Sequence, residues 1–469
     1  MMEKPRILAI IVTWNKKEYV LKLLKALRDL DYPADRLDVV VVDNASTDGT
    51  PEAVREGFPE VHLIVNDKNL GGSGGFNTGL SYAYSLPRGT YKYLWLLDND
   101  VLPHREALSW MVRTLEENPV YGACGSVMMQ LDFPWRINEI GAFFSYSTGE
   151  LRLNYHLLEI PSLVGKDVAE LIKSRIDLSQ YITNLPDVVE VGYSAAASLL
   201  VRDDVARRIG LFKDFFIHYD DVEWCLRMRK EGYPVVVSTR SIIWHLSGIT
   251  KIPTWVLYYD NRNALEVVRL HGTGADLKSV WQRFLKKPLY YTLIGKQDLA
   301  NIIEEGLMDY LKGCFGRKEI KLPWKYASIE ALEEEIEKRK IKKILISPTV
   351  NTWTTGLNKV LNSVLRKHKD VTITVIEGPW QQFQEQTIIK YPVRKILRAV
   401  WNLKNYKKYD LFIQSDYQPL MLLPFTAKYT LCVNDYNASL RPSPQLSDVS
   451  RYIKFYLEFS RKNGMPTPA

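Results

Sequence analysis

Apolar runs and amphipathic stretches alternate along the first third of the chain. The apolar runs, which predict buried strands, are 7–14, 37–44, 61–66, 91–100 and 121–130. The stretches with helical spacing between them are 17–30, 50–58, 74–86 and 104–119. This alternation predicts an α/β fold with a mostly parallel central sheet and helices on both of its faces.

The pattern changes twice further along the chain. Residues 131–190 lose the alternation and are rich in aromatic residues, which suggests an insertion that covers a site. Residues 233–248 predict two short strands with His245 after the second. The pattern is helical over 251–340 and alternates again over 341–469. We therefore expect a main domain at 1–250, a helical extension at 251–340 and a small α/β domain at 341–469.

Polar residues recur where the predicted strands of the main domain end. They are Thr13, Asp43, Asn44, Asp98 and Asp100. Ligands of open α/β sheets bind outside the carboxyl ends of the strands. These residues are therefore the first indication of a functional site.

The segment Asp98-Asn99-Asp100 places two carboxylates one residue apart after an apolar strand. Alternate residues of an extended segment face the same side, so both carboxylates face one way and Asn99 the other. Such a pair suits a divalent cation that keeps positions open for phosphate oxygens and water. An Asp/Asn-rich turn after a strand is the alternative.

The segment 69–79, NLGGSGGFNTG, has four glycines in five residues just before a predicted helix. Glycine permits close backbone approach, and the free N–H groups of a helix start attract anions. The segment does not match the phosphate-binding loop of P-loop ATPases, which disfavours that class. Asp43, at a strand end, is suited to accept a hydrogen bond from a base or ribose, and a helix-capping loop is the alternative.

The segment 218–227, HYDDVEWCLR, is a second concentration of acids. Asp220 and Glu223 have the spacing of a capping box, which would leave Asp221 free to act as a general base for an incoming hydroxyl. Carboxylates that merely favour a helix start are the alternative. His245 follows an apolar run and is of interest as a ligand only if it reaches Asp98 and Asp100.

Composition narrows the class of protein. The chain has 469 residues, 46% hydrophobic and 25% charged, with a net charge of +8. Its four cysteines form no C-x-x-C pair, so neither a zinc cluster nor a disulfide framework is indicated and buried, reduced thiols are expected. The sequence has no apolar run long enough for a membrane span and no signal peptide, so we expect a cytoplasmic protein. The basic stretch 390–408 suits an anionic membrane surface, and a solvated helix face is the alternative.

Seven blocks in a fixed order resemble a known family. They are VTWNKKEYV, VVVVDNASTDGT, NLGGSGGFNTG, WLLDNDV, HYDDVEWCLRMRKEGY, IIWH and YYDNRNAL. Over about residues 5–320 the chain resembles the inverting glycosyltransferases of family two, which have a GT-A fold. Within that family it looks most like the galactofuranosyltransferase and rhamnosyltransferase branch. Residues 341–469 do not match it, although Gly356 after a strand resembles one half of a two-lobed (GT-B) glycosyltransferase.

The resemblance implies roles for matching residues. Residues expected to line the nucleotide and its diphosphate are Thr13, Asn15, Lys16, Asp43, Asn69 and Asp98, with Gly72 and Gly75 beside the diphosphate and sugar. Those expected to hold Mn²⁺ or Mg²⁺ are Asp98, Asp100 and His245. Asp221 is expected to be the base, with Asp220 and Glu223 beside it to fix acceptor hydroxyls. Lys16 stands where the galactofuranosyl enzymes have Arg. Lysine can neutralise a phosphate but cannot bind it with two parallel N–H donors as arginine does, so the resemblance does not determine the identity of the donor. The role of Tyr259, Arg262 and Asn263 is not implied.

The implied activity is inverting transfer of a galactofuranose- or rhamnose-like sugar from a nucleotide-diphosphate donor. The acceptor would be a glycan hydroxyl, lipid-linked, in cell-surface polysaccharide synthesis at the inner face of the membrane. Nucleic acid is not an expected partner. Two alternatives stay open, a sugar-phosphate nucleotidyltransferase and a non-catalytic scaffold that binds sugar nucleotides.

Overall fold

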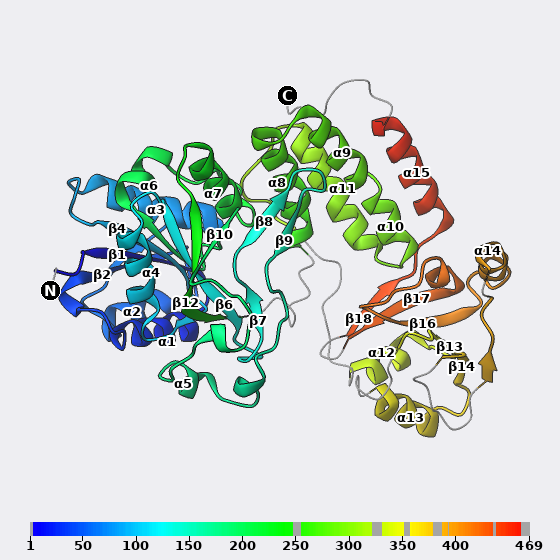
Figure 1. Cartoon of the computed structure of the whole chain (residues 1–469). Helices are drawn as coiled ribbons and strands as arrows, with labels where there is room; N and C mark the ends of the chain where they lie inside the picture. Colours follow the sequence, from blue (N-terminus) through cyan, green and yellow to red (C-terminus); the bar gives the residue numbers. More distant parts are fainter. Residues whose placement is uncertain are drawn as a thin grey trace. The chain divides into compact units, whose positions relative to one another are not determined.

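The structure is a computed structural model and describes residues 3–246, 255–320, 331–350, 357–378, 387–392, 394–434 and 438–460. Contacts group the chain into two compact units (Figure 1). The first is built mainly from Met1–Val280 and Asp309–Lys318, and the second from Trp281–Met308 and Glu319–Met465. The expected division at residues 250 and 340 stays a prediction.

The first unit contains the larger sheet, ordered β10-β12-β6-β11-β4-β1-β2-β3. Its strands are β1 (Ile7–Thr13), β2 (Leu37–Asp43), β3 (His62–Val65), β4 (Tyr93–Asp98), β6 (Ala123–Gln130), β10 (Val188–Val191), β11 (Ser198–Arg202) and β12 (Val235–His245). Strands β3, β2, β1 and β4 are parallel, as are β6 and β12, whereas β11 runs antiparallel between β4 and β6. The short strands β5 (Val101–Pro103) and β7 (Ile137–Glu139) pair with β12 and β6. The predicted α/β class with a mostly parallel centre is confirmed.

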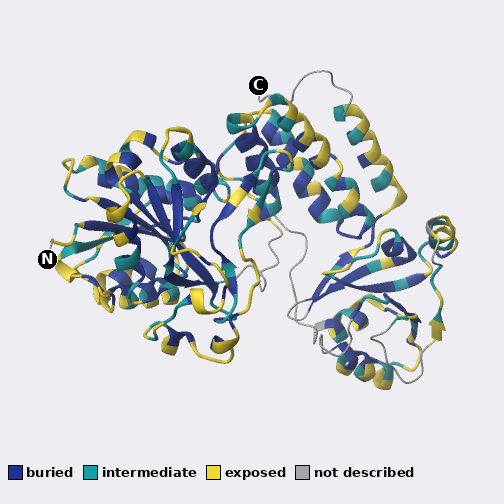
Figure 2. Cartoon of the chain, in the orientation of Figure 1, coloured by how far each residue is buried: buried dark blue, intermediate teal, exposed yellow. Residues whose placement is uncertain are grey.

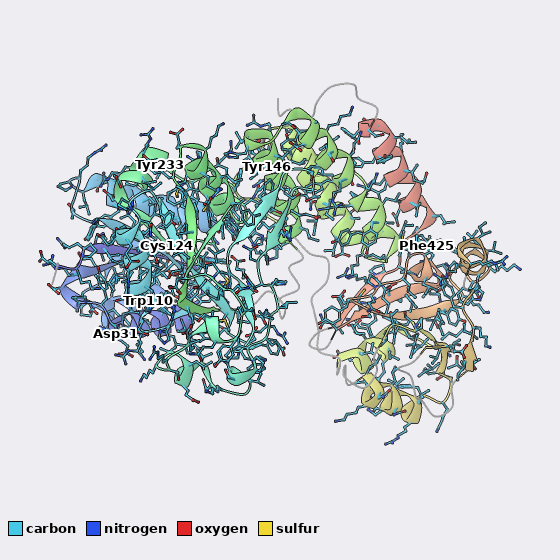
Figure 3. All side chains as sticks on the ribbon, in the orientation of Figure 1. Asp31, Trp110, Cys124, Tyr146, Tyr233 and Phe425 are labelled. Atoms are coloured by element: carbon cyan, nitrogen blue, oxygen red, sulfur yellow. The ribbon has the colours of Figure 1, made fainter. Side chains whose placement is uncertain are left out.

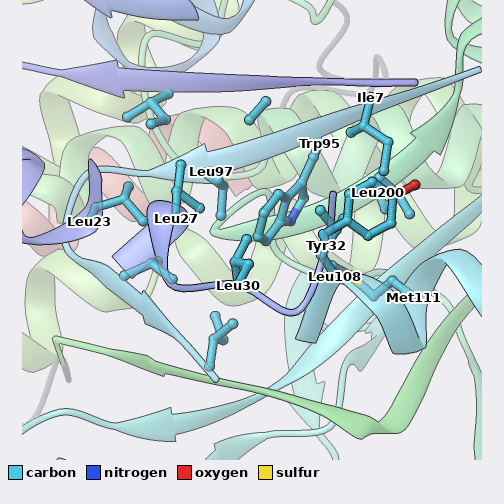
Figure 4. Close-up of a cluster of buried hydrophobic side chains, with 14 of the residues drawn as sticks. Ile7, Leu23, Leu27, Leu30, Tyr32, Trp95, Leu97, Leu108, Met111 and Leu200 are labelled. Atoms are coloured by element: carbon cyan, nitrogen blue, oxygen red, sulfur yellow. The ribbon is translucent and has the colours of Figure 1, made fainter. Parts of the chain in front are cut away.

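Helices cover both faces of this sheet. On one face, α1 (Lys17–Arg28), α2 (Thr50–Gly57) and α4 (Ala107–Glu117) bury their apolar sides against residues such as Trp95 and Leu97 (Figure 4). The helices α3 (Gly71–Ser85), α6 (Asp203–Ile209) and α7 (Asp220–Lys230) lie over the other face (Figure 1). A Cβ at Gly79 would lie 2.3 Å from Ile10 Cγ2, so glycine lets α3 pack directly on β1.

Three details of the first unit differ from the sequence-based prediction. The helix α3 begins at Gly71, so the glycines of 71–75 form its first turns rather than a preceding loop. Residues 233–248 form one strand, β12, with a register shift between Ser238 and Ile242 in place of two strands. The stretch 191–202, whose small and apolar residues predict a single strand, forms a loop over residues 193–197 followed by β11.

The segment 131–190 contains a hairpin of β8 (Ala142–Ser145) and β9 (Glu150–Leu153) and the short helix α5 (Val168–Leu171). Tyr146, in the turn of this hairpin, is labelled in Figure 3. The hydroxyl of Tyr219 donates a hydrogen bond to the carbonyl of Gly149, 3.1 Å away. The hairpin therefore contacts the segment just before α7.

The predicted helical region is present in the described residues. Its helices are α8 (Val256–His271), α9 (Gly274–Phe284), α10 (Lys287–Leu293), α11 (Gln297–Leu311) and α12 (Ala331–Arg339). Within the part of the chain that the structure describes, no helix combines the length and the apolar character needed to cross a bilayer.

The second unit contains a six-stranded sheet ordered β15-β14-β13-β16-β17-β18. Its strands are β13 (Lys343–Ile346), β14 (Thr372–Ile376), β15 (Thr387–Ile389), β16 (Tyr409–Ser415), β17 (Ala427–Val433) and the antiparallel β18 (Ala438–Pro442). Its helices are α13 (Leu357–Lys367), α14 (Lys395–Lys404) and α15 (Leu446–Ser460), with the 3-10 helix η4 (Leu423–Thr426). The chain therefore forms the α/β unit that the sequence predicts, while Gly356 lies outside the described residues.

The four cysteines are isolated thiols, and Cys124, Cys225 and Cys432 are buried as expected. Cys314 is exposed, so the prediction of buried thiols is wrong at that position.

Candidate active site

The strand register brings polar residues to one edge of the larger sheet. Thr13 is paired with Asp43 in the β1–β2 ladder, and Val12 with Asp98 in the β1–β4 ladder. Since these three strands are parallel, their carboxyl ends meet at the same edge. The polar residues that follow apolar strands in the sequence are therefore neighbours in the fold.

Asp98, Asp100 and His245 converge at this edge. The Nε2 atom of His245 lies 3.0 Å from Asp100 Oδ1 and 3.7 Å from Asp98 Oδ2. Each residue offers a ligand atom within 4.8 Å of the other two. Pairing of β12 with β5 positions the histidine, because His245 lies opposite Val101. Residues about 145 positions apart in the sequence thus form one cluster.

Asn99 points away from this cluster, as strand alternation predicts. Its Nδ2 donates to Thr13 Oγ1 over 3.1 Å, which holds the end of β4 against the end of β1. Thr13 itself is buried. The structure therefore gives Thr13 a positioning contact, and its predicted contact with the nucleotide stays a prediction.

The electrostatics of the cluster favour a cation. Burial lowers the pKa of His245, but the hydrogen bonds and charges of Asp100 and Asp98 outweigh it and raise the pKa to about 10. Two carboxylates that draw a positive charge to this position would do the same for a metal ion. Carboxylate oxygens with one imidazole nitrogen form a donor set that suits Mn²⁺ or Mg²⁺.

Asp220 and Asp221 lie at the start of α7. Asp221 accepts hydrogen bonds from the backbone N–H of Val222 at 2.8 Å and of Ala196 at 3.1 Å, so both of its oxygens are oriented. Burial raises the pKa of both carboxyls, and the charge of Asp98 raises them further. A carboxylate whose proton affinity is raised in this way is suited to general-base chemistry.

The first turn of α3 lies beside Asp220. A Cβ at Gly72 would be 3.6 Å from Asp220 Oδ2, whereas a Cβ at Gly75 would be 2.3 Å from Val12 Cγ1. Gly72 thus borders the acids, and Gly75 allows the helix to pack on β1. The glycine at 71 is required for its backbone, since φ is +74° and a Cβ would lie 2.0 Å from the carbonyl oxygen of Phe216.

The predicted capping box is wrong. The residue before α7 is Tyr219, in a left-handed conformation and without a side-chain capping bond, and Asp220 is the first helical residue. Glu223 is buried and bonds Arg227 at 2.8 Å and His271 at 3.1 Å. Burial raises the pKa of Glu223, but its bonds to His271 and Arg227 lower it overall. Glu223 therefore links α7 to α8, and its expected role in fixing acceptor hydroxyls stays a prediction.

The segment before Asp220 has an unusual backbone. Phe216, His218 and Tyr219 all have positive φ angles, between 64° and 67°. Such a conformation costs of order 1 kcal/mol or more for each residue other than glycine, and it persists only where surrounding contacts impose it. We call residues 215–219 the left-handed segment.

The block YYDNRNAL, to which the sequence gave no role, holds the left-handed segment. Arg262 is almost completely buried and donates to the carbonyl of Phe215 at 2.9 Å. Asn263, with no exposed surface, donates from one amide group to the carbonyls of Phe215, Ile217 and His218, at 3.2, 3.0 and 2.9 Å. These contacts from α8 fix the chain immediately before the acids at 220 and 221.

Three further ionisable residues near the acids are not recognisable from the sequence. Burial, with the charge of Asp221, raises the pKa of Glu139 to about 7. Asp260 lies 2.7 Å from Nδ1 of His218. Burial lowers the pKa of His218, but Asp260 more than offsets this and raises it. His218 precedes Asp221 by only three residues, whereas Glu139 and Asp260 reach this region by packing between distant segments. The local sequence assigns none of the three a role.

Asp43 has an incomplete set of partners. It is fully buried, and its Oδ1 accepts a hydrogen bond from the backbone of Ser46 at 2.8 Å. Its Oδ2 has no hydrogen-bond partner among the described residues. A buried carboxylate oxygen without a donor is costly unless a ligand supplies one. Asp43 is therefore the residue of this edge best suited to a donor group on a nucleotide.

Three other residues predicted to line the nucleotide contact protein groups. Asn15 Oδ1 accepts from the backbone of Thr47 at 2.7 Å, and Asn69 Oδ1 from that of Gly71 at 2.8 Å. The ammonium of Lys16 lies 4.7 Å from the ring centre of Tyr19. The two asparagines shape the loops around the edge, and their contact with a nucleotide stays a prediction.

A cavity of about 580 Å³ in the first unit lies apart from these acids. Asp31 and Trp110, which line it, are labelled in Figure 3. Some of its charges are paired, since Arg105 pairs with Asp31 at 2.5 Å and Arg240 with Asp187 at 3.0 Å. The edge around Asp98 and Asp221 differs because its acids repel one another. Burial raises the pKa of Asp220 and Asp221, and the charge of Asp98 raises it further.

Residues 8–165 match the family model described as glycosyl transferase family 2. Over these residues the chain is therefore similar to glycosyl transferase family 2. The resemblance noted from the seven blocks is thereby confirmed. The family 2 match ends before Asp220, Asp221 and His245, so these residues are assigned by their geometry alone.

Relatives of the family 2 domain are distant. Glycosyltransferase AglE of Haloferax volcanii is 25% identical over 232 residues, which are 49% of this chain and 63% of AglE. Galactofuranosyltransferase GlfT2 of Mycobacterium tuberculosis is 23% identical over 262 residues, 54% of this chain and 39% of GlfT2. The matches thus span less than two thirds of either relative.

Among solved structures, the mannosyltransferase PcManGT from Pyrobaculum calidifontis, in complex with GDP-Man and Mn²⁺, aligns with a TM-score of 0.40 at 20% identity. The alignment covers 66% of this chain and 75% of that one.

Proposed function

We propose that this protein is an inverting glycosyltransferase that moves a sugar from a nucleotide-diphosphate donor to a hydroxyl of a glycan acceptor in polysaccharide synthesis. The observation behind this proposal is the convergence of Asp98, Asp100 and His245 into one possible metal site, with the carboxylate of Asp221 close enough for the charge of Asp98 to raise its pKa. Similarity to family 2 supports the reaction class. The match to GlfT2 supports galactofuranose as the first sugar to test, with a rhamnose-like sugar second.

Asp98, Asp100 and His245 would hold Mn²⁺ or Mg²⁺, which when bound neutralises charge on the donor diphosphate. Asp43, with its unpaired buried oxygen, would accept a hydrogen bond from the base or ribose. The N–H groups of the first turn of α3 would add a positive dipole beside the phosphates. Lys16 would supply a further positive charge on the same side.

Asp221 would act as the general base. Its carboxylate removes the proton of the acceptor hydroxyl while that oxygen attacks the anomeric carbon. The bond from the anomeric carbon to the diphosphate oxygen breaks on the opposite face, so the sugar inverts and the nucleoside diphosphate departs. The two backbone hydrogen bonds at 2.8 and 3.1 Å hold the carboxylate in one orientation for this step.

The proposal is tested by incubating the full chain with a panel of sugar nucleotides and measuring release of nucleoside diphosphate. We expect release with Mn²⁺ or Mg²⁺, suppression by EDTA, and the same loss in Asp100→Ala. Release that is insensitive to EDTA and to Asp100→Ala would contradict the assigned metal site.

The same assay separates the two alternatives. A nucleotidyltransferase would release pyrophosphate from a nucleoside triphosphate and a sugar phosphate, and we expect no such release. A non-catalytic scaffold would bind a sugar nucleotide without hydrolysing or transferring it with any acceptor. Lipid-linked glycans are the acceptors to test first, because we propose that the enzyme works at the inner face of the cell membrane.

A further inference from the structure

Helix α14 (Lys395–Lys404), in the second unit, presents its apolar side to solvent. The exposed fractions of its large apolar residues are 80% for Ile396, 52% for Leu397, 44% for Val400 and 62% for Leu403. Their spacing places all four on one stripe of the helix. In Figure 2 this helix is largely coloured as exposed, in contrast to the strands of the same unit.

The opposite side of α14 packs on the unit through Trp401, which lies against the core cluster that contains Phe412, and through two asparagines. Asn402 is 4% exposed and Asn405 is 9% exposed. Asn402 donates to the hydroxyl of Tyr391 at 3.1 Å, and Asn405 to the carbonyl of Trp401 at 2.8 Å. The helix also packs on η4, where Phe425 is labelled in Figure 3. The packing of Trp401 and of η4, together with the bond from Asn402 to Tyr391, therefore holds α14 with its apolar stripe outward.

A helix of the same unit shows the usual arrangement. In α13 the residues Leu357, Leu361 and Val364 are fully buried in the core of the sheet. Four large apolar side chains on a ten-residue helix are expected to be buried in the same way, because exposing them forgoes the main stabilising contribution to folding. The orientation of α14 therefore indicates that its apolar stripe contacts something other than this chain.

The surroundings of the stripe are strongly basic. Residues 386–409 contain seven Lys and Arg and no Asp or Glu. Lys390, Arg394, Lys404 and Lys408 among them are exposed. An exposed apolar stripe bordered by cations is typical of helices that lie in the interface of an anionic membrane.

We propose that α14 docks this protein on an anionic lipid surface. The apolar stripe enters the boundary between headgroups and acyl chains, while the neighbouring cations contact anionic headgroups. A second copy of this chain is a poorer occupant, because a two-fold contact would bring the same basic residues of both copies together. The proposal does not depend on the proposed function, since it concerns a different unit of the chain.

The test is co-sedimentation of the full chain with vesicles of phosphatidylcholine alone or mixed with phosphatidylglycerol. We expect binding to the mixed vesicles, little to the neutral ones, and loss of binding at high salt. The double variant Ile396→Glu, Leu403→Glu is expected to bind at least about tenfold more weakly, and Arg394→Gln about fivefold.

The matched control changes two exposed apolar residues of α15, which are 44% exposed at Ile453 and 41% at Leu457. The variant Ile453→Glu, Leu457→Glu should bind vesicles as the unchanged chain does. Circular dichroism establishes that both double variants fold, and hydrolysis of a water-soluble sugar nucleotide should be unchanged in both.

Two results would overturn the proposal. One is vesicle binding that the changes at 396 and 403 leave intact. The other is absence of vesicle binding together with a dimer in sedimentation velocity that the same changes dissolve, which would assign the stripe to self-association. Neither result depends on whether the first unit transfers sugar.

Discussion

The two sheets of this protein differ in the charges at the carboxyl ends of their strands: the first carries a group of acids, and the second carries an ion pair. In the first unit, Asp98, Asp220 and Asp221 are neighbouring acids, and the charge of Asp98 adds to burial in raising the pKa of the other two. In the second unit, Asp416 follows β16 and is paired with the ammonium of Lys296 at 2.5 Å, both side chains being at most 10% exposed. Neighbouring carboxylates repel one another, and a bound cation would relieve that repulsion. In the ion pair of Lys296 and Asp416, each charge already has a partner of opposite sign. The comparison therefore separates a site for chemistry from a site that stabilises the fold.

The largest expected effect comes from removing the base. Asp221→Asn should reduce transfer at least about 10³-fold, because the amide cannot take up the acceptor proton. Binding of the donor should stay near normal, since we propose that Asp221 acts on the acceptor hydroxyl. Steady-state kinetics and calorimetric titration of donor measure the two quantities. The exposed Asp204, changed to Asn, is the control, and retained turnover in Asp221→Asn would reject the base assignment.

Breaking the matched pair should change stability rather than chemistry. Asp416→Asn leaves the ammonium of Lys296 buried without its counter-charge, which should cost about 3–5 kcal/mol of unfolding free energy. Urea unfolding measures this loss. The solvent-exposed pair of Lys342 and Asp370 provides the control, because Asp370→Asn should cause no measurable change. If Asp416→Asn instead abolished donor hydrolysis in folded protein, the comparison between the sheets would fail.

Loosening the left-handed segment should affect the rate. Asn263→Ala leaves the carbonyls of Ile217 and His218 without this donor, while Phe215 keeps its bond from Arg262, and it loosens the chain before Asp220. A displacement of about 1 Å at the base can cost roughly 10²-fold in kcat. We expect kcat to fall while the KM for donor changes little. The exposed Asn118, changed to Ala, should have no effect, and a loss confined to KM would argue against a positioning role.

The smallest effect is on the pH profile. Because burial and neighbouring acids raise the pKa of Asp221, the base is protonated at a higher pH than an ordinary carboxylate, whose pKa is near 4. On the acid side of the pH profile, kcat should therefore reach half of its maximum, the midpoint, at a pH above about 4. Asp220→Asn removes a neighbouring negative charge and should move the midpoint to lower pH. A midpoint at the ordinary value in the unchanged enzyme would contradict the raised pKa.

The sequence predicts the edge of the first sheet because periodicity alone determines it. Apolar strands that end in Asp43 and Asp98 must bring those residues to one edge once the strands are parallel. The family resemblance added His245, whose distance from Asp100 no local pattern reveals. Glu139 and the clamp formed by Arg262 and Asn263 escaped prediction because their roles come from packing between distant segments.

Two other features could not be predicted from the sequence: the left-handed backbone of Tyr219 and the orientation of α14. The capping-box interpretation failed because the left-handed Tyr219 starts α7 one residue earlier than the Asp220–Glu223 spacing suggests. For α14 the sequence indicates an amphipathic helix but not which side is inward. That side is decided by contacts of Asn402 with Tyr391, which sequence spacing does not encode.

The central claim is that Asp98, Asp100 and His245 together bind one divalent ion. Titration of Mn²⁺ with the full chain, followed by electron paramagnetic resonance with and without a nucleoside diphosphate, tests it most directly. We predict one bound Mn²⁺ per chain, lost in Asp100→Ala and in His245→Ala and retained in Asp416→Asn. Binding that persists in both of the first two variants would contradict the account.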